Sequence, residues 1–306
     1  MKTVVIALGG NALLDPSGKQ SFSMENENIG RVSKSIAELC KNRNYRVVIT
    51  HGNGSQVGDE LMRNEHAKMQ VPKLPLYILN AETQALIGSI LETSLRNSLN
   101  AMKVRRSVCV ILAHVLVDKE DGAFRNPSKQ IGPFYGNKEL GRELALGRFD
   151  YIKSGSKYRR VVSSPKPKGI LELDPIKSEV SRHIVITCGG GGIPTVRKGK
   201  MFYGIDAVID KDLTTQLLAN SINAEKMIIL TNTDYVYGNY GKHANRIKEV
   251  RASTIKRRLE KFENGTIRPK IEACVRFIEN GGKEAYIGDV FSLDAILKRK
   301  SGTMIH

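Results

Sequence analysis

The feature that most constrains this chain is a repeated unit, in which a short apolar run leads directly into a turn. Four copies stand out: "TVVIAL" before "GGNAL", "YRVVIT" before "HGNGSQVG", "HIVITC" before "GGGGIPTV" and "KMIILT" before "NTDYVYG". Continuous apolar runs bounded by glycine are typical of parallel strands buried on both faces. Between them, segments such as "ENIGRVSKSIAELCKN" and "AETQALIGSILETSLRNSL" have helical spacing. We therefore expect an α/β fold with helices on both faces of a mostly parallel sheet.

Two segments depart from this unit. Residues 118–170 are rich in Pro, Gly and Lys and contain only short strand-like runs, so we expect them to leave the sheet as a subdomain or a lid. Residues 241–271 are strongly basic and are expected to connect the last strands. At 306 residues the chain is long enough for one large domain or for two lobes on a common sheet.

The charge balance favours anionic partners. Lys and Arg number 48 against 31 Asp and Glu, which gives a formal net charge of +17 and an isoelectric point near 9.7. A chain this basic attracts nucleotides, phosphates, nucleic acid or an acidic membrane surface. Charge alone does not choose among them and says nothing about the fold.

Cysteine spacing and hydropathy favour a reduced, soluble, cytoplasmic protein. Cys40, Cys109, Cys188 and Cys274 form no C-x-x-C pair, so neither a zinc site nor a disulfide framework is expected. Glycines in "ALGGNAL" interrupt the N-terminal apolar run too early for a signal peptide. The longest other apolar stretch, "VCVILAHVLV", is about half as long as a membrane helix.

The glycine turns suit a bound phosphate. Ligands of parallel sheets bind beyond the carboxyl ends of the strands, and backbone N–H groups at helix N-termini attract anions. A tight turn can also need glycine for its own conformation, but four turns in the same place, one of them the quartet Gly189–Gly192, favour anion binding. The P-loop sequence, the G-x-G-x-x-G turn, the H-R-D and D-F-G motifs and clustered His/Cys metal motifs are all absent from the sequence.

The stretch "GIDAVIDKDLTTQLL" places Lys211 between Asp210 and Asp212, where a strand or loop passes into an amphipathic helix. A lysine at a helix start is most often solvated surface charge. Held by carboxylates in a cleft, it would instead stabilise the charge of a transferring phosphoryl group.

These motifs resemble those of carbamate kinases in the amino acid kinase superfamily. Four further blocks share the resemblance: "NPSKQIGPF", "RRVVSSPKPKGI", "LTNTDYVYGNYGK" and "RPKIEAC". They follow the family's order from the first residues to the "SGTMI" ending, so the resemblance covers nearly the whole chain. The blocks "CGGGGIP" and "AVIDKD" are long enough to make chance agreement remote.

The resemblance implies reversible phosphoryl transfer between ATP and carbamate, giving ADP and carbamoyl phosphate, with Mg²⁺. It implies a three-layer α/β/α sandwich and a single amino acid kinase domain over residues 1–306. An N-terminal lobe (about 1–200) would take the small acid and a C-terminal lobe (about 201–306) the nucleotide, with 118–170 as the family's protruding subdomain. A homodimer is usual, and neither a membrane nor, despite the charge, a nucleic acid is expected as partner.

Phosphoryl transfer requires chiefly positioning and positive charge. By the resemblance, Lys211 and Lys270 hold the transferring phosphoryl group and the nucleotide phosphates, and Lys129 reaches the substrate from the subdomain. Asp212 would organise the lysines, since a carboxylate beside them keeps both charged. Asp210 would either serve Mg²⁺ or cap the helix. No other side-chain metal ligand is predicted, so Mg²⁺ would be held mainly through ATP.

The resemblance also assigns the two sides of the cleft. On the acid and γ-phosphate side, backbone N–H groups and two Asn amides would be the donors, from Gly9, Gly10, Asn11, Gly52, Asn53 and Gly54. On the nucleotide side, Asp234 and Tyr237 would contact ribose and adenine, although an aromatic here is as often core. His51 is expected to pack or to shape a turn rather than to act in catalysis.

The chain departs from the family pattern at a few positions. Superfamily relatives usually carry a lysine before the first glycine turn, where this chain has Ala7; carbamate kinases share that departure, which counts against acetylglutamate, aspartate and UMP kinases. Ser55 and Gln130 stand where prolines are common, and no glycine follows Thr231. Losing a proline loosens a loop, so we expect an altered KM or loop closure rather than another reaction.

Other functions remain open from the sequence alone. A related kinase for another small acid or phosphate would keep the lysines but change the loops at Gly52–Gly58 and 118–170. A nucleotide-responsive protein that binds nucleic acid would use the charge, but the chain offers no recognition motif for it. Synthesis of ATP during arginine or agmatine breakdown is a metabolic inference from the resemblance.

Overall fold

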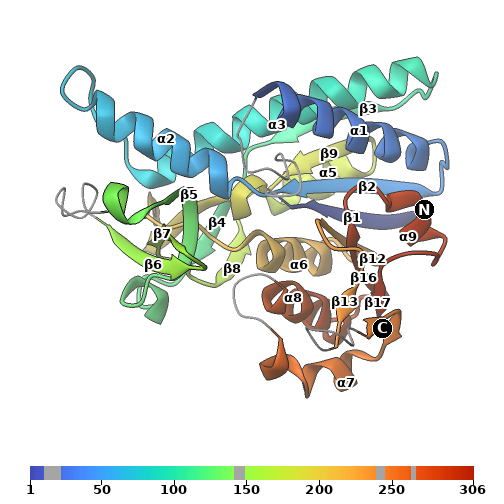
Figure 1. Ribbon diagram of the computed structural model, residues 1–306. Helices are drawn as coiled ribbons and strands as arrows, with labels where there is room; N and C mark the ends of the chain where they lie inside the picture. Colours follow the sequence, from blue (N-terminus) through green and yellow to red (C-terminus); the bar gives the residue numbers. More distant parts are fainter. Residues whose placement is uncertain (10–21, 141–148, 239–244, 263–266) are drawn as a thin grey trace.

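The structure is a computed structural model that describes residues 1–9, 22–140, 149–238, 245–262 and 267–306. Its centre is an eight-stranded sheet in the order β15-β17-β16-β12-β1-β2-β9-β3 (Figure 1). These strands are β1 (Lys2–Leu8), β2 (Tyr45–His51), β3 (Ser107–Ile111), β9 (His183–Thr187), β12 (Lys226–Thr231), β15 (Glu249–Val250), β16 (Glu284–Asp289) and β17 (Thr303–Ile305). Every neighbouring pair is parallel except β16 and β17. The expected mostly parallel sheet is confirmed.

The central strands are buried on both faces, as their continuous apolar runs predict. In β1, Val4, Ile6 and Leu8 belong to one core cluster, whereas Val5 and Ala7 belong to the other. Successive side chains of a strand point to opposite faces, so one apolar run supplies both cores. Burying these side chains contributes the hydrophobic free energy that fixes the register of the sheet.

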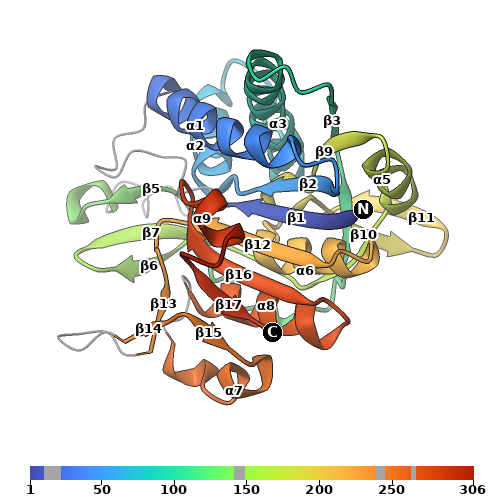
Figure 2. The ribbon, with the colours of Figure 1, turned by 90° about the vertical axis from the view of Figure 1, so that its right-hand side faces the viewer.

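Helices cover both faces and complete three layers (Figure 1). On one face lie α1 (Phe22–Cys40), α3 (Leu76–Ala101) and α9 (Leu293–Leu297); on the other lie α5 (Leu173–Val180), α6 (Lys211–Ser221), α7 (Ala252–Lys256) and α8 (Arg268–Glu279). Figure 2 shows the strands side by side below α1 and α3. The buried residues of α1, among them Ile29, Val32 and Ile36, recur at the helical spacing that the sequence predicts.

The apolar stretch 108–117 is divided between two sheets. Its first part lies in β3, and its second part forms β4 (His114–Val117). Strand β4 belongs to a second sheet in the order β11-β10-β4-β8, with β8 (Pro167–Ile170), β10 (Ile193–Lys198) and β11 (Met201–Gly204). None of the described helices is long and apolar enough to cross a bilayer.

Most of the predicted excursion forms a separate antiparallel sheet beside the main body. Its strands are β5 (Lys129–Tyr135), β7 (Lys157–Val162) and β6 (Asp150–Ser154), preceded by the short η1 (Gly122–Phe124). The end of the excursion, β8, returns to the second sheet by pairing with β4.

Helix α2 (Gly54–Ala67) packs against β5 and projects from the body on the same side (Figure 1). The two backbones touch, because a Cβ on Gly58 would lie 2.0 Å from the Cα of Gly132. Only glycine permits this approach. Helix α2 and the subdomain are therefore joined along a close backbone contact.

The remaining short elements are connections. Between β9 and β10 lies η2 (Gly189–Gly191), and between β12 and α8 lie β13 (Val236–Tyr237), β14 (Arg246–Ile247) and η3 (Leu259–Lys261). All four cysteines are free thiols, with Cys40, Cys188 and Cys274 buried, as predicted for a chain without a disulfide framework.

Candidate active site

The first side chains of the site come from the start of α6. Asp210 is the N-cap of this helix, and its Oδ1 accepts hydrogen bonds from the backbone N–H groups of Asp212, at 2.9 Å, and Leu213, at 3.4 Å. An aspartate in this position satisfies N–H groups that have no partner within the helix. Of the two expectations for Asp210, the cap is confirmed. The cap also fixes the next two residues, Lys211 and Asp212, at the beginning of the helix.

Two lysines meet at Asp212. The Nζ of Lys211 lies 2.6 Å from Oδ1 of Asp212, and the Nζ of Lys270 lies 3.1 Å from Oδ2. Lys270 comes from the first turn of α8, which begins at Arg268 with Pro269 behind it, a favourable residue at a helix start. Helices α6 and α8 pack side by side. That packing places the carboxylate of Asp212 between the two ammonium groups.

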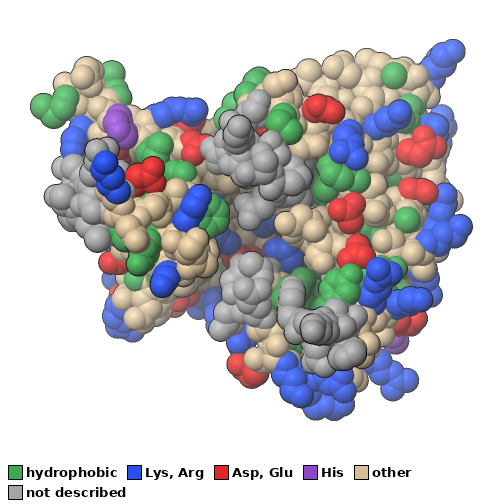
Figure 3. Space-filling model, viewed as in Figure 1, with side chains coloured by type: hydrophobic (Ala, Val, Ile, Leu, Met, Phe, Trp, Pro, Cys, Tyr) green, Lys and Arg blue, Asp and Glu red, His purple; other side chains and the backbone are tan. Residues whose placement is uncertain are grey.

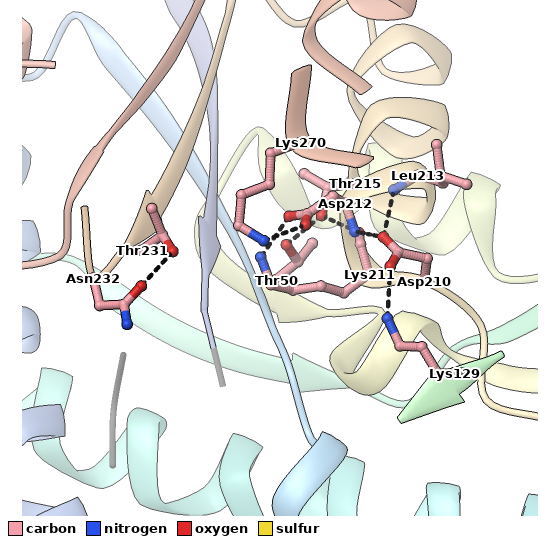
Figure 4. Close-up of polar contacts among 10 residues, drawn as sticks. All are labelled: Thr50, Lys129, Asp210, Lys211, Asp212, Leu213, Thr215, Thr231, Asn232 and Lys270. Carbon is pink, nitrogen blue, oxygen red and sulfur yellow. Dashed lines mark hydrogen bonds and ion pairs between the residues drawn. The ribbon is translucent and has the colours of Figure 1, made fainter. Parts of the chain in front are cut away.

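A third lysine reaches the same place from the subdomain. The Nζ of Lys129, the first residue of β5, lies 2.6 Å from Oδ2 of Asp210. Figure 4 shows Lys129, Lys211 and Lys270 converging on the two aspartates from three different elements. Figure 3 shows a hollow between the subdomain side and the main body, with basic side chains visible at its floor.

The carboxylates of this cluster are ionised. Burial opposes ionisation of Asp212, but Lys211 and Lys270 outweigh it and bring its pKa far below the usual range. Burial likewise opposes ionisation of Asp210, and Lys129 outweighs it, so that this pKa is lowered too. Both aspartates therefore act as hydrogen-bond acceptors for lysines and are not proton donors.

The two lysines on Asp212 titrate differently. Burial lowers the pKa of Lys211, which is only 8% exposed, although Asp212 opposes this. Burial also disfavours the charged form of Lys270, but Asp212 and Asp210 outweigh it and raise its pKa. Lys211 is therefore the ammonium group of this pair that loses its proton first as the pH rises.

On the acid side, the donors differ from those expected. The N–H of Gly9 donates to the carbonyl oxygen of Leu230 at 2.8 Å, and the N–H of Gly52 donates to that of Leu8 at 3.0 Å. Both bonds extend the ladders between neighbouring strands by one residue, so neither N–H is available to an oxyanion, which corrects that expectation. Gly10 and Asn11 lie outside the described residues.

The side-chain amide of Asn53 already donates hydrogen bonds within the protein. Its Nδ2 donates to Oδ1 of Asn80 at 3.1 Å and to Oγ1 of Thr83 at 2.9 Å, both on α3. The expectation of a substrate-binding amide is therefore corrected to one that anchors the loop. The free donors here are those of the first turn of α2, which begins at Gly54, since the first N–H groups of a helix lack intrahelical partners. Such N–H groups could bind an anion beyond the end of β2.

The quartet Gly189–Gly192 does not open an α-helix, contrary to the expectation for such turns. It forms the short η2 and then enters β10. Gly190, Gly191 and Gly192 have φ values of 64°, 87° and 86°, which a right-handed helix cannot continue. Of the four glycine turns, only the one after β2 leads directly into an α-helix within the described chain.

This turn instead packs tightly under the site. A Cβ on Gly190 would lie 2.2 Å from Nδ2 of Asn53, and one on Gly189 would lie 2.2 Å from Nε2 of His51. His51 is 1% exposed, and burial lowers its pKa to about 4, so it is neutral at pH 7. These contacts give His51 the packing role that was expected for it.

The predicted nucleotide side lies beyond β12. The hydroxyl of Tyr237 donates to Oδ1 of Asp234 at 2.8 Å, and the backbone N–H of Tyr235 donates to the same oxygen at 3.0 Å. Tyr237 is in β13, paired with β14. The two residues assigned to ribose and adenine are therefore in mutual contact.

Some residues that support the site were not singled out from the sequence. Asn80 and Thr83 accept the hydrogen bonds of Asn53. The hydroxyl of Thr214 donates to the carbonyl oxygen of Gly191 at 3.0 Å. The hydroxyls of Thr50 and Thr215 are 2.6 Å apart. A signal for the first pair was present: polar residues three apart on the buried face of an otherwise apolar helix.

The site offers no ready metal centre. Within the ranges that the structure describes, no group of three His, Cys, Asp or Glu side chains is placed to hold a metal ion. Both oxygens of Asp210 and both of Asp212 already accept hydrogen bonds. Three lysine ammonium groups lie against these two carboxylates and would repel a resident cation, so no step is assigned to one.

Comparison with known proteins decides the family. The model of the amino acid kinase family matches residues 2–289. The carbamate kinases of Pyrococcus furiosus and Thermoplasma acidophilum are each 39% identical to this chain, over 99% and 100% of it and 99% of their own lengths. This chain belongs to the amino acid kinase family, in its carbamate kinase group. The resemblance seen in its motifs is thereby confirmed.

Solved structures share the fold of this amino acid kinase. The carbamate kinase of Giardia lamblia bound to AMP-PNP is 34% identical, with a TM-score of 0.89, over 99% of this chain and 98% of that one. The same enzyme bound to citric acid has a TM-score of 0.94. An N-acetylglutamate synthase from Neisseria gonorrhoeae, at 14% identity and a TM-score of 0.59, shares the fold alone.

Proposed function

We propose that this amino acid kinase is a carbamate kinase, which transfers a phosphoryl group reversibly between ATP and carbamate. One observation carries this: three lysines converge on two aspartates at the start of α6, in a chain that matches carbamate kinases from end to end. Three ammonium groups against two carboxylates leave an excess of positive charge for phosphate oxygens.

The chemistry requires little besides that charge. In the ATP-forming direction, an oxygen of the β-phosphate of ADP attacks the phosphorus of carbamoyl phosphate. The bond from phosphorus to the carbamate oxygen breaks, and its electron pair stays on carbamate. No proton moves in this step, so no general base is needed. Lys211 and Lys270 stabilise the equatorial oxygens, Asp212 holds both lysines, and Lys129 binds the acid side.

The two substrates approach from opposite lobes in this proposal. The acid and the transferring phosphate lie in the N-terminal lobe, at the first turn of α2 beside Gly52–Gly54 and Gly9. The nucleotide lies in the C-terminal lobe, where Asp234 and Tyr237 contact ribose and adenine. Mg²⁺ enters on the phosphates of the nucleotide, whose oxygens are ligands that this cation prefers.

Further parts of the proposal concern the setting of the enzyme. We infer a cytoplasmic homodimer that makes ATP in arginine or agmatine breakdown. An exposed apolar edge supports self-association: Met201, Phe202 and Tyr203 of β11 are 61%, 48% and 49% exposed. An edge strand with exposed apolar side chains can pair with a second copy.

The test is the formation of ATP from ADP, Mg²⁺ and carbamoyl phosphate by purified protein, with Lys211→Ala alongside. We expect rapid ATP formation that falls by roughly a thousandfold in the variant. A matched control is Lys298→Ala, which removes an exposed lysine paired with Asp294. Absence of ATP from folded protein that still binds ADP would overturn the proposal in favour of a kinase for another small acid.

A further inference from the structure

Asp210 differs from Asp212 in what its two oxygens do. Both oxygens of Asp212 accept from lysines, whereas Asp210 divides its carboxylate between the helix and the subdomain. Its Oδ1 caps α6, and its Oδ2 accepts from Lys129 at 2.6 Å. Both oxygens of Asp210 therefore already have a partner within the protein.

The bond between Lys129 and Asp210 connects two parts of the molecule. Lys129 opens β5, the strand that leads into the three-stranded subdomain sheet, and Asp210 lies 81 residues further along, at the helix that carries Lys211. Their side chains are 28% and 18% exposed, so water only partly screens the pair. The subdomain is therefore tied to the catalytic helix through a lysine assigned to substrate.

The same geometry leaves donors for the substrate. Each of the three lysines makes one hydrogen bond to its carboxylate, so each can keep that bond and still donate its other N–H groups to a phosphate oxygen. A lysine already held in place loses less conformational freedom when the substrate arrives. Without Asp210, Lys129 would be a flexible side chain at the edge of a subdomain.

We propose that Asp210 is a positioning residue, which holds Lys129 and the start of β5 against the N-terminus of α6, where the lysine can donate its other N–H groups to a phosphorylated acid. Asp210 does not touch substrate. It acts through Lys129, and its removal is expected to weaken binding of the acid and not of the nucleotide. The substrate in this inference rests on the proposed function, but the contact itself does not.

Asp210→Asn separates the two tasks of the residue. Asn caps helices about as well as Asp, so α6 is expected to form and the protein to unfold at nearly the wild-type temperature. The amide carries no charge and would turn an NH₂ group toward Lys129. Asp210→Ala removes the cap as well and is the comparison for loss of folding.

The first measurement uses no substrate. Wild-type protein and Asp210→Asn are treated briefly with an amine-acetylating reagent, and modification of each lysine is followed by mass spectrometry. We expect Lys129 to react several-fold faster in the variant. Asp118→Asn is the matched control, because Asp118 pairs with Lys168 at 3.3 Å through exposed side chains. An unchanged rate at Lys129 overturns the inference whatever the enzyme's substrate is.

The second measurement is kinetic. For Asp210→Asn we expect the KM for carbamoyl phosphate to rise about tenfold, with the KM for ADP within about twofold of wild type. Added to Lys129→Ala, Asp210→Asn should cause little further loss, because it acts through that lysine. An equal rise in both KM values, or independent effects in the double variant, would overturn the inference. If the wild type itself makes no ATP, the proposed function fails and the labelling result still stands.

Discussion

The ammonium group of Lys270 lies 3.1 Å from Oδ2 of Asp212, although the two residues are 58 positions apart in the chain. The same carboxylate accepts from Lys211 at 2.6 Å on its other oxygen. Asp212 is 3% exposed, so this arrangement is screened little by water. Two positive charges are thereby kept together at one place, where either alone would be costly to bury.

Asp212→Asn should disable the enzyme while conserving its shape. Two buried ammonium groups then lose their shared carboxylate, and we expect kcat to fall by about a hundredfold or more. The assay is ATP formation from carbamoyl phosphate and ADP. Asp294→Asn, which neutralises an exposed partner of Lys298, is the control and should leave kcat unchanged. A near-normal kcat in Asp212→Asn would show that catalysis does not need Asp212 to hold the two lysines.

The pH dependence of that reaction should follow Lys211. Because burial lowers the pKa of this lysine, kcat should decline on the alkaline side before an ordinary lysine loses its proton. Asp212 raises the same pKa, so Asp212→Asn should move the decline to lower pH. Profiles of kcat from neutral to alkaline pH test this. An alkaline decline at the same pH in both proteins would show that another group titrates.

His51 should make the fold sensitive to acid. Its pKa is about 4 in the folded protein against an ordinary value of 6.5, so between these values the unfolded chain binds a proton that the folded chain does not. The free energy of unfolding therefore falls as the pH drops from 6.5 to 4, by about 3 kcal/mol from this residue. Denaturation of wild type and His51→Gln at several pH values gives the difference. Parallel curves would contradict it.

Two glycines with similar φ angles should respond differently to alanine. Gly199 has φ 59° with nothing near its missing Cβ, so Gly199→Ala should cost about 1 kcal/mol for the left-handed conformation. Gly190 has φ 64° and lies against the Asn53 side chain, so Gly190→Ala should cost about 3 kcal/mol or more and disturb the acid site. Urea denaturation compares the free energies of unfolding of the two variants. Equal losses of stability would show that the turn at Gly190 can move to accommodate a Cβ.

Metal removal should affect activity but not the protein alone. Chelation with EDTA is expected to abolish ATP formation, and added Mg²⁺ to restore it, since the cation accompanies the nucleotide. Without nucleotide, EDTA should leave the melting temperature unchanged, because no metal-ligand group occurs in the part of the chain that the structure describes. A lower melting temperature in EDTA would reveal a resident ion.

The sequence predicted the parts of this molecule that depend on local pattern. Apolar runs rich in Val and Ile marked β1, β2, β9 and β12, and the aspartate before Lys211 marked the start of α6, because burial and capping act through neighbouring residues. The meeting of the lysines came from family resemblance, since no local rule brings α8 and β5 to α6.

What the sequence missed depends on long-range contacts. The register between neighbouring strands decides whether the N–H groups of Gly9 and Gly52 can donate to an anion. Here the hydrogen-bond ladders continue one residue beyond β1 and β2 and use both N–H groups. Whether the quartet Gly189–Gly192 starts a helix is decided by positive φ values in a turn packed on Asn53 and Ile209. The cap of α6 by Asp210 was among the sequence expectations, but its contact with Lys129 depends on a residue 81 positions away and was not predicted.

The place of β1 has a consequence for how the protein is made. Residues 2–8 are synthesised long before residues 226–231, yet they occupy the middle of the sheet, between β2 and β12. One edge of this apolar strand has no partner until residues 226–231 have been synthesised. An unpaired apolar edge is prone to association with other chains. More than 200 residues must therefore be translated before both edges of β1 are paired, and we expect the nascent chain to depend on chaperones more than a protein with local pairing would.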